Sequence, residues 1–144
     1  MIRMNKVILL FSLTLFSSIV TLGEMTVPAI REFFRGSILF LLPFVIFFLL
    51  SSLLLFYTII GDTSGWLRVF LLITGGAGAG VFISILLHNL IYGIFVHFFG
   101  EVIWHGVGGD EPVFFFFGLI VCPILYLIGA LGASITFFVQ TRGH

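Results

Sequence analysis

Four long stretches without a charged side chain divide this chain. Neither Asp, Glu, Lys nor Arg occurs within residues 7–23, 37–60, 69–99 and 113–139. A helix needs about 20 apolar residues to cross the hydrocarbon core of a bilayer, which is about 30 Å thick. The last three stretches exceed that length, so the pattern predicts transmembrane helices at these positions.

The apolar residues within these stretches are continuous rather than alternating. A strand of a transmembrane barrel alternates lipid-facing with lumen-facing residues, whereas Ile38–Leu42 and Phe114–Phe117 are apolar throughout. A helix satisfies its backbone N–H and C=O groups internally, as the hydrocarbon region requires. We therefore predict an all-α integral membrane protein, a bundle of four transmembrane helices that forms a single domain over residues 1–144.

The first stretch has two interpretations. Arg3 and Lys6 precede a short apolar segment, and residues 21–23 resemble the small residues at the cleavage site of a secretory signal peptide. A retained first span fits the same residues, because Ile2 and Gly23 extend the apolar segment. Retention predicts four transmembrane helices and cleavage predicts three; we favour retention.

Lys and Arg are distributed unequally between the two sides of the predicted bundle. With four spans, one side carries both termini and the loop 61–68, and its basic residues are Arg3, Lys6, Arg68 and Arg142. The other side has Arg31 and Arg35. Because loops rich in Lys and Arg stay in the cytoplasm, we predict that both termini are cytoplasmic.

The two outer connections differ in character. Residues 24–36 are too polar to span a membrane, and Pro28 is well placed to begin a short helix there. This segment predicts either a helix lying in the membrane interface or a plain loop. Residues 100–112 are rich in Gly and acidic side chains, which predicts an outer loop.

The composition agrees with this pattern. Hydrophobic residues make up 60% of the 144 residues and charged residues 8%, and the mean hydropathy is +1.32. Soluble domains carry about 25% charged residues, so the composition excludes an ordinary soluble protein. Six basic residues balance six acidic ones, which leaves no net charge to attract nucleic acid. The predicted partner is the lipid bilayer.

Small and polar residues form two rows in the third and fourth stretches. Counting by fours gives one row in each, Gly76, Gly80, Ser84, His88 and Tyr92 in the third and Gly118, Cys122, Tyr126, Ala130 and Ser134 in the fourth. Residues four apart share a helix face, and small residues allow helices to approach closely while polar ones hydrogen-bond across the contact. We predict that the two rows face each other, with His88 buried near Tyr126 or Cys122.

Two sets of residues are candidate cofactor sites. An imidazole can bind haem iron, so His88 is a candidate haem ligand; the alternative is a neutral histidine that only packs. His97, Glu101 and His105 would share a face if their helix continued past Gly100, and two imidazoles with a carboxylate suit a transition metal. The alternative is an acidic rim in solvent with histidines at the interface.

The predicted function is that of a non-enzymatic membrane subunit, whose helices pack in a homo-oligomer or with the subunits of a larger membrane complex. The connections are too short to form a separate domain, and neither a catalytic constellation nor a family motif is matched residue for residue. Two other classes stay open. One is a haem- or metal-binding membrane anchor that uses the histidines above. The other is a small oligomeric transporter or channel lined by Ser84, His88, Asn89 and Tyr92.

Overall fold

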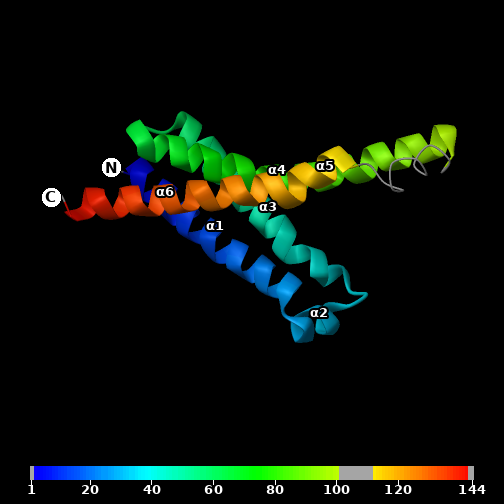
Figure 1. Ribbon diagram of the computed structural model, residues 1–144. Helices are drawn as coiled ribbons and strands as arrows, with labels where there is room; N and C mark the ends of the chain where they lie inside the picture. The colour runs from blue at the N-terminus through cyan, green and yellow to red at the C-terminus, as the bar shows by residue number, and fades with distance from the viewer. Residues whose placement is uncertain (1, 101–111, 143–144) are drawn as a thin grey trace.

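The computed structural model describes residues 2–100 and 112–142, which are folded almost entirely into helices (Figure 1). The long helices are α1 (Ile2–Thr26), α3 (Leu42–Ile60), α4 (Gly65–Phe99) and α6 (Cys122–Arg142). Short elements join them: α2 (Pro28–Phe34), the 3-10 turn η1 (Ile38–Leu41), α5 (Pro112–Phe116) and the π-helical turn η3 (Phe117–Val121). No strand occurs among these residues.

Four helical stretches are long and apolar enough to cross a membrane. They are Asn5–Thr26, Ile38–Ile60, Gly65–Phe99 and Val113–Arg142. An apolar helix with few charges is the structure that a charge-free stretch of this length favours. The prediction of an all-helical chain with four long apolar helices is therefore confirmed.

The helices pack in the order α1, α3, α4, α6. Helix α4 contacts both α3 and α6, and α1 packs on α3. Both chain ends and the α3–α4 turn lie at one end of the bundle, whereas α2 lies at the other (Figure 1). At the first end all four helices contribute to one core, which consists of Val7, Phe11, Leu54, Leu67, Leu71 and Ala133.

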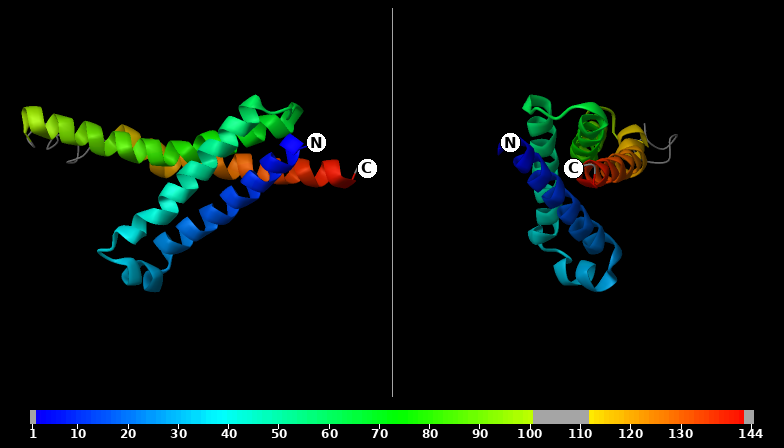
Figure 2. Two further views of the ribbon diagram at one scale, coloured as in Figure 1. Left: turned by 180° about the vertical axis from the view of Figure 1, so that it is seen from behind. Right: turned by 90° about the vertical axis from the view of Figure 1, so that its left-hand side faces the viewer.

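The bundle opens towards its other end. Helices α1 and α3 diverge there from α4 and α6, so the two pairs form a V (Figure 2). A second cluster lies where the pairs separate and contains Phe47, Ala77, Tyr126 and Ala130. Past that cluster the two pairs run apart, as the view from behind shows.

The buried face of α1 changes from apolar to polar along the helix. Val7 and Phe11 are buried near its start, and the following buried positions are Thr14, Ser17, Thr21 and Glu24. These positions are three or four residues apart, so they form a single helix face. The opposite face is exposed and apolar. Helix α1 thus has its polar residues inside and its apolar residues outside, the reverse of a helix on a water-soluble protein.

Glycines allow α4 to lie close to both neighbours. A Cβ atom at Gly75 would lie 2.8 Å from the backbone nitrogen of Leu55 in α3. A Cβ atom at Gly129 of α6 would lie 2.8 Å from the backbone nitrogen of Thr74 in α4. Both distances are too short for any side chain, so only glycine permits these backbone contacts.

The π-helical turn η3 ends two residues before Pro123. Proline has no N–H, and its ring clashes with the carbonyl four residues earlier in a regular helix. The wider turn avoids this clash, because the N–H of Cys122 bonds to the carbonyl of Phe117, five residues back. The wider turn also adds rotation between α5 and α6.

The segment 24–36 divides between the end of α1 and the helix α2. Pro28 occupies the first turn of α2, and none of the residues of this helix is buried. Arg35 and Glu32 form an exposed ion pair of 2.7 Å. Gly36, with a φ of 77°, takes the left-handed conformation that turns the chain towards η1. Most of the predicted loop 100–112 lies outside the described residues.

Candidate functional site

The middle of the two predicted rows forms a close contact between α4 and the α5–α6 segment. A Cβ atom at Gly80 would lie 2.9 Å from Sγ of Cys122, and one at Gly118 would lie 3.1 Å from Cβ of Ser84. The side chains of Ser84 and Cys122 are hydrogen-bond partners. Ser84 is buried. This group of four residues is a packing contact with one polar link.

The outer members of the rows lie elsewhere. Gly76 has open space beside its Cα atom, and its neighbours Gly75 and Gly78 face α3 instead. The hydroxyl of Ser134 donates to the carbonyl of Ala130 within the same helix. Four residues advance a helix by about 400°, so a row of fours drifts by about 40° per step. Two such rows therefore meet over one or two turns and then rotate apart.

Tyr126 connects α6 to two other helices. Its hydroxyl donates to the carbonyl of Thr14 in α1 over 3.3 Å, and Ser18 is a further hydrogen-bond partner. Its ring meets the ring of Phe47 in α3 edge-on, with 5.3 Å between the centroids. Tyr126 is almost fully buried. Tyr126 therefore links α6 to both α1 and α3 at the point where the two helix pairs separate.

We predicted that His88 is buried near Tyr126 or Cys122. In the structure it is half-buried and lies next to Phe115 of α5, with 5.5 Å between the ring centroids. Helices α4 and α6 are antiparallel, and Ser84 already opposes Gly118 and Cys122. One turn further along α4 therefore corresponds to one turn earlier on the partner segment, which is α5 and not the middle of α6.

A cavity of about 260 Å³ adjoins His88. It is lined by Ile85, His88, Asn89, Phe115 and Leu119. The amide of Asn89 donates to the carbonyl of Ile85 over 2.8 Å, so one of its polar groups is used within α4. The cavity volume is below the roughly 300–1,000 Å³ of typical small-molecule sites. Tyr92 follows one turn later and is half-buried.

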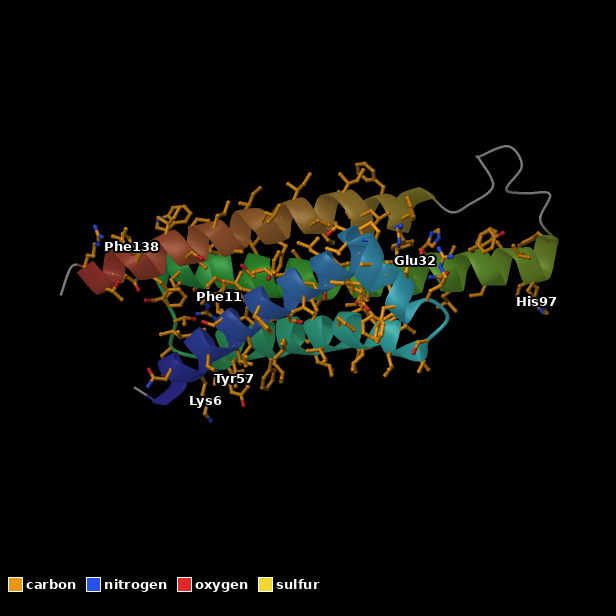
Figure 3. The ribbon with its side chains drawn as sticks, turned by 90° about the horizontal axis from the view of Figure 1, so that it is seen from below. Lys6, Phe11, Glu32, Tyr57, His97 and Phe138 are labelled. Atoms are coloured by element: carbon orange, nitrogen blue, oxygen red, sulfur yellow. The ribbon has the colours of Figure 1, made fainter. Side chains whose placement is uncertain are left out.

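The second candidate cofactor set is described only in part. His97 lies in the last turn of α4, is exposed, and contacts the ring of Phe98 edge-on (Figure 3). Glu101 and His105 lie outside the described residues. Among the residues that the structure describes, no group of three His, Cys, Asp or Glu side chains is placed to hold a metal ion.

Basic side chains lie at the end of the bundle that carries both termini. The ammonium group of Lys6 is 6.0 Å from the ring of Tyr57, and the guanidinium group of Arg142 is 4.1 Å from the ring of Phe138. Arg68 donates to the carbonyl of Ile59. Figure 3 shows Lys6 and Phe138 near this end and Glu32 and His97 towards the other.

Glu24 is a site residue that the sequence analysis missed. The sequence analysis placed it in the polar connection 24–36, but it belongs to the last turn of α1 and is 2% exposed. Both of its carboxylate oxygens lack a hydrogen-bond partner. The signal that points to it is its spacing of three from Thr21, which continues the buried stripe of α1.

The chain matches no protein-family model, and comparisons with curated proteins and with solved structures found no match. Its function therefore has to be inferred from its own residues. The threonine hydroxyls of the long helices donate to carbonyls of their own helix, as those of Thr58 and Thr74 do, so they bind no other helix through that proton. Two features could still bind a ligand or an ion. They are the cavity beside His88 and the carboxyl group of Glu24.

Proposed function

We propose that this chain is a multi-pass integral membrane protein with four spans and with both termini in the cytoplasm. The outward faces of all four long helices support membrane insertion, because they carry large apolar side chains such as Phe16, Leu49, Ile83 and Leu131. Apolar surface of this extent is unfavourable in water. The basic residues Lys6, Arg68 and Arg142 at the end with the termini support the orientation.

Within the membrane, we propose that the protein is a non-enzymatic subunit that packs with copies of itself or within a larger membrane complex. The observation that carries this proposal is the divergence of α1 and α3 from α4 and α6 (Figure 2). Lipid tails are as apolar as leucine, so helices associate in membranes through close packing. A bundle that closes at only one end leaves packing surface for another helix.

Two further observations agree with an incomplete bundle. Only 17% of the span Ile38–Ile60 is buried inside the chain. Gly23, Gly76 and Gly93 have open space beside their Cα atoms, so their backbones are accessible to a helix from another chain. The glycines that serve the chain's own packing, such as Gly75 and Gly129, have no such space.

Native mass measurement after gentle detergent extraction tests this proposal. We expect a multiple of the 16.0 kDa chain mass or a stoichiometric complex with another membrane protein. Leucine at Gly76, Gly93 or Gly23 would block a close helix contact with another chain, and a Cβ atom at each of these positions meets nothing of the chain itself within 4 Å. The variant in the contact should reduce the assembled mass, and the other two serve as matched controls. A monomer without a partner would contradict the proposal.

A further inference from the structure

Glu24 is a buried acid with nothing to neutralise it. The residue is 2% exposed, and neither carboxylate oxygen has a hydrogen-bond partner. Glu32, eight residues later, is by contrast exposed, and its carboxylate pairs with Arg35 at 2.7 Å. The burial of Glu24 without a donor or a cation is therefore specific to its position on α1.

The side chains that share its helix face add oxygen atoms. Ser17 and Thr21 are 6% and 8% exposed and lie two turns and one turn before Glu24 on the buried stripe. The hydroxyl of Thr21 donates its proton to the carbonyl of Ser17 over 2.9 Å. Its oxygen can then act towards Glu24 only as an acceptor. The nearest buried hydroxyl on this helix face, that of Thr21, therefore does not donate to the Glu24 carboxylate.

The basic side chains of the packed elements do not supply the missing charge. On α1, Lys6 is eighteen residues from Glu24, or about 27 Å along the helix. On α2, Arg31 is exposed and Arg35 pairs with Glu32. On α3 the single ionisable side chain is Tyr57, which lies beneath Lys6. In the described part of the chain, Arg35 and Glu32 form the only ion pair.

A buried carboxylate without a partner is strongly unfavourable, so it has to acquire a positive charge or leave the interior. We propose that Glu24 is a binding site for one small monovalent cation, a proton or a sodium ion taken from water. The single formal charge matches a monovalent ion, whereas a divalent ion would leave a net positive charge buried. A proton would convert the group to a neutral acid able to donate to an acceptor oxygen. A sodium ion would be held by the carboxylate oxygens, the ligand type that hard cations prefer.

Binding of this ion stabilises the packing of the end of α1 against α2 and the start of α3. An ion that binds the folded protein and not the unfolded one stabilises the folded form by mass action. A proton bound in this way stabilises the fold at low pH, and that stabilisation is lost as the pH rises. A sodium ion adds stability that grows with its concentration; above its Kd, a tenfold increase changes the ratio of folded to unfolded protein about tenfold.

Thermal unfolding of the purified full-length protein tests the site. The measurement covers mildly acidic to mildly alkaline pH, with sodium chloride or choline chloride at equal ionic strength. Wild type and the exposed-acid control Glu32→Gln should lose stability with rising pH in choline, or gain stability with sodium at a fixed pH. Glu24→Gln, which is neutral and nearly isosteric, should lack that response. A response to pH alone assigns a proton, and a saturating response to sodium assigns the metal ion.

A chemical label keeps the proposal testable if Glu24→Gln does not fold. An apolar carbodiimide reacts with protonated carboxyl groups, and mass spectrometry locates the modified residue in wild-type protein. Labelling of Glu24 should decrease as the pH rises or as sodium is added, while exposed Glu32 is the internal comparison. The proposal is overturned if Glu24 labelling responds to neither ion, or if Glu24→Gln keeps the full pH and sodium response of the wild type.

Discussion

At the scale of single residues, the hydroxyl group of Tyr126 is the clearest polar link between the two helix pairs. It donates to the carbonyl of Thr14, which is 112 positions earlier in the chain. Removal of this hydroxyl in Tyr126→Phe should lower the free energy of unfolding by about 0.6–1 kcal/mol, because hydrogen bonds between membrane helices contribute about that much. Tyr126→Ala should cost about 3–5 kcal/mol, since the lost ring leaves a cavity.

Reversible unfolding in mixed detergent micelles measures these differences. Tyr57→Phe is the matched control, because the hydroxyl of Tyr57 has no hydrogen-bond partner within the described residues. Equal effects of the two Tyr→Phe changes would show that the Tyr126–Thr14 bond contributes nothing specific.

His88 offers a second test at this scale. Its ring lies against Phe115, and the next histidine on the helix, His97, is nine residues or two and a half turns further on. Two histidines on opposite faces of one helix cannot bind the same haem iron. We expect purified protein to show no Soret absorption band and no stoichiometric metal. A Soret band that disappears in His88→Ala would replace the proposed packing role with that of a haem anchor.

The spacing of residues in the sequence predicts a helix face but not its partner. The rows by fours predict that the two helix faces oppose each other, and the structure brings Gly80 and Ser84 together with Gly118 and Cys122. The register between two antiparallel helices depends on the length and shape of the connection between them. That connection contains residues 101–111, so the position of His88 opposite α5 was not predictable from spacing alone.

At the scale of elements, the backbone contact between α4 and α6 depends on Gly129. A Cβ atom there would lie 2.7 Å from Oγ1 and 2.8 Å from the backbone nitrogen of Thr74. Because neither atom can move away without shifting a helix, Gly129→Ala should destabilise the protein by about 1–3 kcal/mol, the usual cost of overpacking.

Gly76→Ala is the matched control for this contact. Its Cα atom faces open space, so the added methyl group meets nothing, and alanine favours a helix over glycine by roughly 0.5–1 kcal/mol. In detergent that keeps the chain monomeric, the thermal midpoint of Gly76→Ala should equal or exceed that of the wild type, whereas that of Gly129→Ala should fall. A fall of the same size in both variants would contradict the close approach of α6 to α4.

The limits of the elements show where charge patterns predict well and where they fail. The charge-free stretches locate all four long helices, because few charges and great length together require internal backbone bonding in lipid. Helix α4 nevertheless begins at Gly65 and includes Arg68 in its first turn. The guanidinium group of Arg68 reaches the carbonyl of Ile59 at the end of α3. A charged residue in the first turn of a helix is thus compatible with the fold, although Arg68 bounds the charge-free stretch from which the helix was predicted.

The inward polar face of α1 was harder to predict. In the sequence, Thr14, Ser17 and Thr21 occur among leucines and phenylalanines without any charge to mark a side. Each threonine bonds to a carbonyl of its own helix, so it fits either a lipid-facing or a buried position. Only the packing of α1 on α3 determines which face is buried.

At the scale of the whole molecule, the arrangement of the ends predicts how the protein sits in a membrane. Both termini and the α3–α4 turn share one end of the bundle, and α2 lies at the other (Figure 1). Asp62 in that turn and Glu32 in α2 are both exposed, and a single long helix, α3, separates them. If α3 crosses the bilayer, these two positions are on opposite sides.

Cysteine labelling in sealed cells tests this topology. In a Cys122→Ser background, Glu32→Cys should react with a membrane-impermeant maleimide added outside, because α2 lies on the side with fewer basic residues. Asp62→Cys should react only after the membrane is permeabilised, because Lys6, Arg68 and Arg142 hold its side in the cytoplasm. The reverse pattern would show that the orientation is wrong. Labelling of both positions from the same side would show that α3 does not span the bilayer, and the four-span proposal would then fail with it.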